Sequence, residues 1–426
     1  MSGTLSLWLC GEFAGHLTEA QDGSVSFRYA DSYRDRSAAD ALPAVSASLP
    51  LTRSAHPASL VDPWLDNLLP DDDEVRRLWA ARFGERHPSA FALLRRMGAD
   101  CPGAVQVLAE GAAPTDAAKL QPLTESGIAA HIAELRRNPA QWLLPDRGGR
   151  WSLGGQQSKF ALALIGGEWF APSGRAASTH IVKTGIAGLE LSDVAEFVTL
   201  SAARALGLPV AGANLTHFGD QVTLVVSRFD RVVGAEGTVT RLHQEDFCQA
   251  SGRWRAQKYQ VDGGPSLADC AALIERVTDR RDRERSLRDF ARALCFNWAC
   301  AGTDAHAKNF AFVYAGRRAA LAPFFDLLSA TLIWPPSEVE FKAKLAMKVA
   351  GRYRLRRIGL PQLRAAAPDL RVDADFVQAT AVDYAQAVPD AVADAVRSAQ
   401  EAGAVSTARA AAFIDNAAAR SRSLRL

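Results

Sequence analysis

One stretch constrains the fold more than any other part of the chain, residues 297–326, NWACAGTDAHAKNFAFVYAGRRAALAPFFD. Within it, a polar loop lies between an apolar run with helical spacing and an apolar run typical of a strand. The loop carries four functional side chains, which are Asp304, His306, Lys308 and Asn309. A second strand-like run, LAPFF, then leads to Asp326. The expected fold therefore places two carboxylates on loops that a short strand pair connects.

This spacing suits phosphoryl transfer. Such a site needs one carboxylate to orient the attacking hydroxyl, and oxygen ligands that hold Mg²⁺ on the nucleotide phosphates. Asp304 and Asn309 are five positions apart, which is the Asp-to-Asn separation of the protein-kinase catalytic loop. Asp326 would complete the metal site, as the second metal-binding aspartate of kinases does. An Asp and an Asn at this spacing are common in polar loops, so the motif alone leaves an ordinary solvated turn open.

Composition limits the other functions that the chain can have. At 426 residues the chain is long enough for two or three domains. Its 49 Lys and Arg nearly balance its 47 Asp and Glu, so the formal charge is only +2. We expect no global nucleic-acid or membrane binding, and any such role would need a local patch or a partner.

Six scattered cysteines show no CxxC pair and no zinc-like spacing. Cys295 and Cys300 flank the apolar helix before the polar loop, and buried small hydrophobic side chains are a better explanation of this pair than metal binding or redox chemistry. The N-terminal residues MSGTLSLWLCGEF lack the features of a signal peptide, and no run is apolar enough to span a bilayer. We therefore expect a cytoplasmic protein with no membrane association.

The pattern of apolar residues predicts four parts. Residues 1–110 read as a small α+β unit, with strands over 4–30, a polar connection over 31–44, and a strand at 103–110. Residues 111–148 read as a linker followed by a helix that starts at Thr124–Ser126. Residues 149–232 form the nucleotide-binding part, and 233–426 a helical lobe that holds the catalytic loop 303–309. The alanine-rich C-terminal helices are expected to break at Pro389 and Gly403.

Two further stretches are candidates for nucleotide contacts. In RWSLGGQQSKFALALI (150–165), glycines would let backbone N–H groups approach phosphate oxygens, while Lys159 supplies charge. The sequence is not a Walker A loop, and taken alone it is better explained as a glycine hairpin. Lys183 ends the strand-like STHIVK, as a phosphate-binding strand lysine would, and Glu196 on the next helix is its candidate ion-pair partner. A solvated lysine and a surface glutamate are the alternative.

The segment LAMKVAGRYRLRRI (345–358) is basic. It would suit phosphate or an acidic partner, although a solvated basic face is the more common explanation of such a run.

A set of motifs runs in a fixed order to about residue 360. In the N-terminal part these are SFRYADSY, VSASLPL, WLDNLLP and FALLRRMGADCPGAVQVL. In the second part they are SLGGQQSKFAL, THIVK, SRFDR, LHQEDFCQA, GTDAHAKNFAF and LAPFFDLL. With these motifs the chain resembles the HipA family, the serine/threonine-kinase toxins of bacterial toxin–antitoxin modules.

The resemblance implies an α+β, two-lobed, protein-kinase-like fold with a HipA-type N-terminal subdomain and a mostly helical C-terminal lobe. It also implies a kinase that uses ATP and Mg²⁺ to phosphorylate a protein serine or threonine, such as one on an aminoacyl-tRNA synthetase, and so arrests growth and favours persistence. The implied partner is a HipB-like DNA-binding antitoxin, through which the chain would associate with DNA.

The resemblance also implies roles for the residues of this sequence that stand at the family's motif positions. Asp304 would be the catalytic residue, Asn309 and Asp326 would hold magnesium, and Ser152 would be the autophosphorylated serine whose modification ejects the phosphate loop. The residues expected to line the nucleotide site are Gly154, Gly155, Gln156, Gln157, Ser158, Lys159, Lys183, Ser227, Arg228, Phe229, Gln244, His306, Lys308, Asn309, Phe325 and Asp326.

Two positions depart from the family pattern. Ser227 stands where the family usually has Glu in the hinge, and Phe325 stands where Tyr commonly precedes the metal-binding Asp. Both put nucleotide affinity in doubt rather than the chemistry.

Two alternatives stay open, a catalytically weak kinase-like corepressor that acts through the antitoxin, and a kinase for a small molecule. The complete set of Asp304, Asn309, Asp326 and Lys183 argues against the corepressor.

Overall fold

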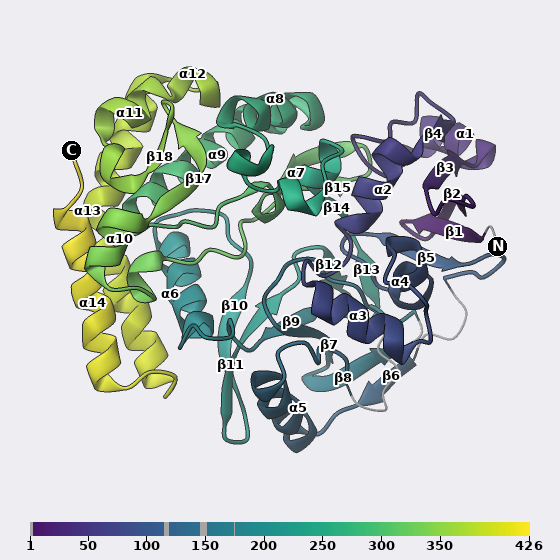
Figure 1. Ribbon diagram of the computed structural model, residues 1–426, viewed down its shortest axis with the longest axis horizontal. Coiled ribbons are helices and arrows are strands. Elements are labelled where there is room, and N and C mark those ends of the chain that lie inside the picture. The colour runs from purple at the N-terminus through teal and green to yellow at the C-terminus, as the bar shows by residue number, and fades with distance from the viewer. Residues whose placement is uncertain (1–2, 115–118, 145–150, 174) are drawn as a thin grey trace. The chain divides into compact units, whose positions relative to one another are not determined.

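The structure is a computed structural model that describes residues 3–114, 119–144, 151–173 and 175–426 (Figure 1). The chain divides into two compact units, each built from three segments. Unit 1 comprises Met1–Thr184, Ser227–Arg255 and Phe312–Ala319. Unit 2 comprises Gly185–Val226, Ala256–Ala311 and Ala320–Leu426.

The first sheet of unit 1 is antiparallel, with the strand order β4-β3-β2-β1-β5. Its strands are β1 (Thr4–Leu9), β2 (Glu12–Glu19), β3 (Val25–Tyr29), β4 (Ala55–His56) and β5 (Val105–Ala109). In β3 the apolar residues Val25, Phe27 and Tyr29 are buried while the residues between them are exposed. This alternation is what a half-buried strand requires, and it made the strands of this region predictable. The associated helices are α1 (Asp31–Asp40), α2 (Ala58–Asp66), α3 (Asp73–Arg82) and α4 (Ala90–Met97).

The rest of unit 1 contains strands of the predicted nucleotide-binding part. Four of them are consecutive neighbours in one antiparallel sheet, β9 (His180–Lys183), β7 (Lys159–Ile165), β8 (Glu168–Ser173) and β6 (Lys119–Pro122). The other elements are α5 (Glu125–Arg137), β12 (Arg231–Val233), β13 (Val239–Arg241), β14 (His243–Asp246) and α7 (Phe247–Ala250). Two further strands, β15 (Ala311–Ala315) and β16 (Arg318–Leu321), lie mostly in unit 1 and pair beside β14.

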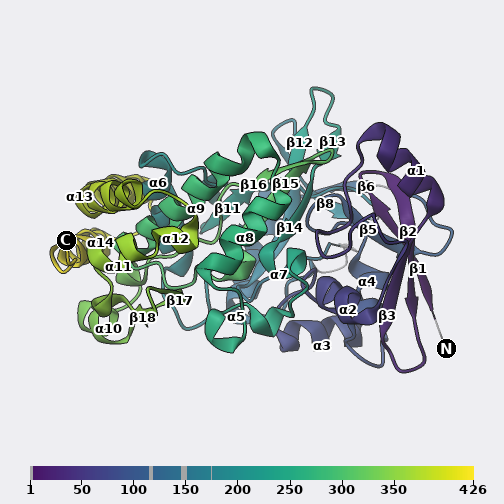
Figure 2. The ribbon, with the colours of Figure 1, turned by 90° about the horizontal axis from the view of Figure 1, so that it is seen from above.

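Unit 2 is mostly helical. Its helices are α6 (Ser192–Ala205), α8 (Leu267–Val277), α9 (Arg280–Cys300), α10 (Pro336–Lys342), α11 (Leu360–Ala365), α12 (Ala367–Leu370), α13 (Ala374–Glu401) and α14 (Thr407–Arg422). Two hairpins accompany them, β10 (Ala213–Phe218) with β11 (Gln221–Ser227), and β17 (Lys344–Val349) with β18 (Arg352–Arg354). Figures 1 and 2 show α13 and α14 running side by side, and α13 also packs on α6 and α9.

The predicted helix break at Pro389 is wrong, because α13 runs through this residue and ends at Glu401. A proline cannot donate the backbone hydrogen bond to the carbonyl four residues earlier. That carbonyl, Ala385 O, instead accepts a hydrogen bond of 2.7 Å from Ser421 Oγ on α14. A hydrogen bond from α14 thus replaces the bond within α13 that Pro389 cannot make. The break at Gly403 is confirmed, since this residue has a φ of +65° between α13 and α14.

Two elements lie in stretches that were predicted as connections. Helix α1 occupies most of residues 31–44, and it is tied down where Tyr33 Oη donates to Pro43 O (2.8 Å). It has no broad apolar stripe that would have predicted a helix. Strand β6 lies in the predicted linker and is recruited by pairing with β8, which local sequence does not encode. Helix α5 begins after Thr124, as predicted, with the Thr124 side chain accepting from Gly127 N.

Candidate active site

The predicted site residues fall in both units. Unit 1 holds Ser152, Gly154, Gly155, Gln156, Gln157, Ser158, Lys159, Lys183, Ser227, Arg228, Phe229 and Gln244. Unit 2 holds Glu196, Asp304, His306, Lys308, Asn309, Phe325 and Asp326. Each group is described within its own unit.

The end of α9 positions the predicted catalytic loop, residues 303–309. The helix stops at Cys300 because Ala301 takes a left-handed conformation (φ +59°), and Gly302 N then bonds Asn297 O at 2.7 Å. A Cβ on Gly302 would lie 2.0 Å from Asn297 Oδ1, so only glycine fits there. The chain is thereby turned away from the helix just before Asp304.

Within the loop, hydrogen bonds to the Asp304 carbonyl fix Asp304 relative to Asn309. The Asp304 carbonyl accepts from His306 N (2.8 Å) and from Asn309 Nδ2 (2.7 Å). Because the amide nitrogen of Asn309 is used in this way, its Oδ1 is the atom that would ligate a cation. The Asp304 side chain is half exposed, whereas His306, Lys308 and Asn309 are buried. The carboxylate is therefore accessible to a hydroxyl group while its support is rigid.

Tyr259, which no sequence motif indicated, also contacts this loop. Its hydroxyl donates to Asp304 Oδ1, and its ring packs edge-on against His306 with centroids 4.8 Å apart. The preceding Lys258 O accepts from Ala307 N at 3.0 Å, so this segment pairs with the loop backbone. Since Tyr259 lies far before Asp304 in the sequence, no local spacing could have predicted the contact.

The segment before Asp326 is also held within unit 2. Phe324 exchanges backbone hydrogen bonds with residues 209–211, donating to Pro209 O (2.7 Å) and accepting from Ala211 N (2.8 Å). Asp326 itself has a φ of +52°, a conformation that Asp tolerates better than most residues but that remains uncommon. Such backbone strain is frequent at functional sites. Phe325 and Asp326 are both half-buried.

In unit 1, the predicted phosphate loop is anchored to the N-terminal part. Ser152 N bonds Asp100 O (3.0 Å), and Asp71 N bonds Gly155 O (2.8 Å). Ser152 is fully buried, and its hydroxyl lies 3.4 Å from Cys101 Sγ. The predicted modification site is therefore enclosed in this conformation of the loop.

Lys159 and Lys183 are direct partners in the antiparallel pairing of β7 with β9. Opposite residues of such a pair project from the same face of the sheet. Both lysines are buried, and Lys159 Nζ donates to Gly154 O at 2.8 Å. Two ammonium groups on one face repel one another, so this arrangement suits a bound polyanion such as a phosphate chain.

The predicted hinge, 227–229, has a mainly structural middle residue. Arg228 N donates to Thr179 O (2.9 Å), and its buried guanidinium bonds both carboxylate oxygens of Asp230 (3.0 and 2.9 Å). Its side chain thus faces the interior. Ser227 Oγ lies 3.2 Å from His180 Nε2, and Phe229 is half-buried.

Arg228 belongs to a buried ionic cluster formed by Asp100, Arg228, Asp230 and Arg231, with Arg241 at its edge. Arg231 Nη2 bonds Asp100 Oδ1 at 2.9 Å. Burial alone would raise the pKa of the Asp100 carboxyl, but the neighbouring arginines, Arg231 foremost, hold it well below its usual range. The cluster therefore stays charged at neutral pH and joins the N-terminal part to the hinge.

Glu245, which follows the predicted Gln244, is the more deeply buried of the two residues. Glu245 is buried, and its carboxylate accepts from Ser46 Oγ (2.5 Å), Ala47 N (2.9 Å) and the Tyr314 hydroxyl. Burial raises its pKa to about 7, even though these three hydrogen bonds lower it. The Gln244 amide reaches only to 3.5 Å from Asp230 Oδ2. Glu245 thus bridges the N-terminal VSASLPL loop and strand β15, which follows the catalytic loop.

The donors present suit magnesium better than a transition metal. Asn309 and Asp326 offer oxygen atoms, and Mg²⁺ is commonly held by one or two carboxylates together with substrate phosphates. In the described part of the chain, no cluster of three or more His, Cys, Asp or Glu side chains forms a metal site. The structure describes all six cysteines, and none of them forms a disulfide. Cys295 and Cys300 are buried, as the sequence predicted.

This site has the features of a kinase-like phosphoryl-transfer protein. They are an exposed carboxylate on a braced loop, an Asn bonded to the backbone of that loop, and a second Asp after a strand pair. Family models agree, since the HipA-like C-terminal domain matches residues 151–402 and the HipA N-terminal domain matches residues 5–108. The chain belongs to the HipA family.

Individual relatives support this assignment. The chain is 34% identical to "Putative kinase Y4mE" of Sinorhizobium fredii, over 99% of this chain and 98% of that protein. It is 28% identical to "Serine/threonine-protein kinase toxin HipA" of Shewanella oneidensis, over 83% of this chain and 81% of that protein. Its fold matches HipA in a HipA, HipB and operator DNA complex from the same organism, with a TM-score of 0.81, 24% identity, and coverage of 99% and 97%.

These findings confirm the predicted family, the kinase-like fold of mixed helices and sheets, and the kinase class. Of the helices in the described residues, none combines the length and the apolar character needed to cross a membrane.

Proposed function

We propose that this chain is an ATP- and Mg²⁺-dependent protein serine/threonine kinase that acts as the toxin of a type II toxin–antitoxin module. The observation that carries the proposal is the braced catalytic loop, in which Asn309 Nδ2 bonds the Asp304 carbonyl at 2.7 Å while the Asp304 carboxylate stays half exposed. This geometry lets the carboxylate orient a hydroxyl without moving the metal ligand.

Each residue type then has a role. Asp304 Oδ1 is held by Tyr259, so Oδ2 is the oxygen that would accept the proton of the substrate hydroxyl. Lys159 and Lys183 would bind phosphate oxygens from one face of their sheet. Asn309 and Asp326 would hold Mg²⁺, which when bound neutralises charge on the phosphates. Glu196 as the ion-pair partner of Lys183 remains part of the proposal.

The remaining predicted residues would surround the nucleotide. The backbone of 227–229 would contact adenine, since the Arg228 side chain is committed to the ionic cluster. The loop from Gly154 to Lys159 would enclose the phosphates, with Gln244, His306, Lys308 and Phe325 as further lining residues.

The proposal extends to self-inactivation at Ser152. Ser152 is buried beside Cys101, and two backbone bonds hold the surrounding loop to the N-terminal part. Phosphorylation would therefore require the loop to leave this place. A phosphate carries close to two negative charges, which would oppose its return to a site built for ATP phosphates.

Substrate and partner follow from the family. We infer a translation component such as an aminoacyl-tRNA synthetase as substrate, and a HipB-like antitoxin through which the chain would associate with DNA. The partner is supported by the fold match to HipA in a complex with HipB and operator DNA.

The experiment is intact-mass analysis of the purified chain before and after incubation with ATP and Mg²⁺. We expect the parent to gain one phosphate that maps to Ser152, Ser152→Ala to gain none there, and Asp304→Ala to gain none at all. Dephosphorylated parent protein that binds ATP and gains no phosphate would refute self-phosphorylation. Growth arrest on expression that Asp304→Ala abolishes would distinguish the toxin from a corepressor.

A further inference from the structure

The basic segment predicted from the sequence forms a cationic strip on unit 2. No Asp or Glu occurs between Lys342 and Pro368, whereas eight Lys or Arg do. Two of the eight have acidic partners, Lys342 with Glu338 (3.3 Å) and Arg364 with Asp375. The other six form no ion pair with any described residue, and they define the strip: Lys344, Lys348, Arg352, Arg354, Arg356 and Arg357.

The strip brings like charges together. Lys344 on β17 lies directly opposite Arg354 on β18, and both are exposed. Like charges at opposite positions of an antiparallel pair destabilise the hairpin. Nearby carboxylates would relieve this repulsion, and residues 343–368 contain none. The charge pattern therefore fits a surface that an anionic partner completes.

Neutral groups hold several of these cations in place. The Arg356 guanidinium lies over the Phe341 ring at 5.3 Å, and Lys348 Nζ lies over the Tyr353 ring at 5.3 Å. Arg354 Nη1 donates to Phe341 O at 3.1 Å. The charges are thus oriented but not neutralised. A cation covers one face of each ring and Tyr353 is only half-exposed, so the other face of Phe341 is the main aromatic surface left for base stacking.

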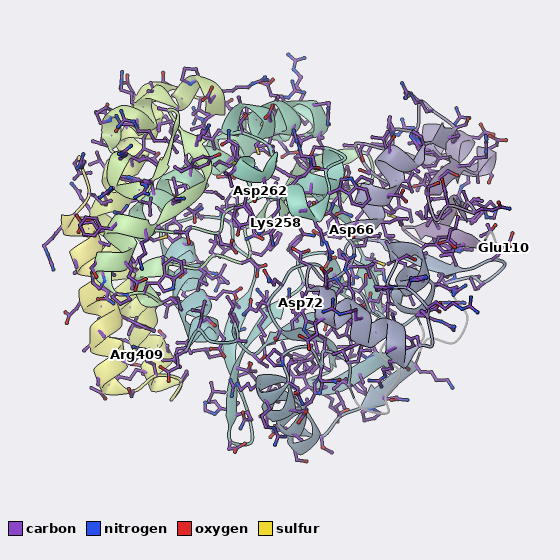
Figure 3. The ribbon with its side chains drawn as sticks, in the orientation of Figure 1. Asp66, Asp72, Glu110, Lys258, Asp262 and Arg409 are labelled. Atoms are coloured by element: carbon purple, nitrogen blue, oxygen red, sulfur yellow. The ribbon has the colours of Figure 1, made fainter. Side chains whose placement is uncertain are left out.

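The strip is connected to the catalytic loop. Lys348 N donates to Gln260 Oε1 at 2.6 Å, and Gln260 follows Tyr259, whose hydroxyl bonds Asp304. Lys258 and Asp262, labelled in Figure 3, flank this short segment. A protein bound to the strip would therefore lie within reach of the residue that orients the acceptor hydroxyl.

We propose that the cationic strip is the docking surface for an acidic segment of the protein substrate. This inference rests on the proposed kinase function. Arginine forks pair with carboxylates through two parallel hydrogen bonds, and a patch of one sign also speeds encounter with an oppositely charged partner. The substrate would be recognised by carboxylates near its acceptor serine or threonine.

The test is fluorescence anisotropy at physiological ionic strength, with labelled oligoglutamate as the probe. Lys344→Gln with Arg354→Gln removes the opposed pair, and Arg280→Gln with Arg281→Gln removes two exposed cations from the start of α9 as the matched control. We expect binding to weaken by roughly 2- to 30-fold in the strip variant, as for the loss of two surface ion pairs, and to stay unchanged in the control. The charge-conserving double variant, Lys344→Arg with Arg354→Lys, should bind the probe as the parent does.

Equal binding by the strip variant and the control would overturn the proposal. So would tighter binding of a labelled single-stranded RNA of equal length, since this would assign the strip to nucleic acid. Phosphate gain at Ser152, measured in the same preparations, should persist in the strip variant, and its loss there would contradict a role confined to docking. A parent that binds oligoglutamate through the strip but transfers phosphate neither to itself nor to a protein substrate would refute the proposed function and leave the anionic-peptide site in place.

Discussion

The raised pKa of Glu245 makes a sharp prediction about stability and pH. Burial raises this pKa from an ordinary value of 4.5 to about 7. The folded state therefore binds a proton that the unfolded chain releases, so the stabilisation is complete below about pH 4.5 and is lost as the pH rises through about 7. Each pKa unit corresponds to about 1.4 kcal/mol. Between about pH 5 and pH 8, this group alone should lower the free energy of unfolding by about 2.5 kcal/mol.

The other groups around Glu245 do not mimic this effect. His243, which stacks on Tyr314 at 4.9 Å, has its pKa lowered by burial to about 4 and so stays neutral over this range. Burial raises the pKa of Tyr29 above the range. Asp246 raises the pKa of Glu245 through its charge, and this contribution is part of the shift.

The assay is urea unfolding of the parent and of Glu245→Gln from about pH 5 to about pH 8 at constant ionic strength. Gln keeps the shape of the side chain and cannot titrate, so the variant should lose about 2.5 kcal/mol less over this range than the parent. The exposed Glu236→Gln, in the same unit, should match the parent. Equal pH slopes in the parent and Glu245→Gln, with equal m values, would refute the reasoning.

Three further predictions concern activity and stability. Asp304→Asn should slow phosphate incorporation by about 10²- to 10⁴-fold, because it removes the carboxylate that takes the hydroxyl proton; radiolabelled ATP measures this, and a loss under tenfold would contradict the role. Asp100→Asn should destabilise unit 1 by about 3–5 kcal/mol, since it removes one of the two carboxylates that the buried arginines of the cluster share, and leaves Asp230 to balance them; a urea midpoint close to that of the parent would contradict this. Ser421→Ala should cost about 1 kcal/mol in the parent but less beside Pro389→Ala, where an N–H again satisfies Ala385 O; additive losses in a double-mutant cycle would refute it.

The sequence predicted best what depends on local spacing. The alternation in β3, the helix before the catalytic loop, and the Asp304-to-Asn309 separation are all properties of neighbouring residues, and the motif order identified the family. The roles of the site residues and the four-part division of the chain stay predictions.

What the sequence missed depends on contacts between distant segments. Tyr259 reaches Asp304 from far along the chain, and Ser421 supplies the bond that lets α13 continue through Pro389. Arg228 stands in a motif that implied nucleotide contact, yet its side chain is buried with Asp230. Each of these outcomes depends on which distant segments pack together, and local sequence patterns do not predict such contacts.

The buried ionic cluster also bears on how separable the two family domains are. Asp100 lies in the segment matched by the N-terminal domain model, whereas Arg228 and Arg231 lie in the segment matched by the C-terminal one. Cutting the chain between these segments would strand a carboxylate on one fragment and guanidinium groups on the other. Either segment expressed alone would therefore hold charges whose partners lie on the other segment, so we expect the two domains to be stable only as parts of one chain.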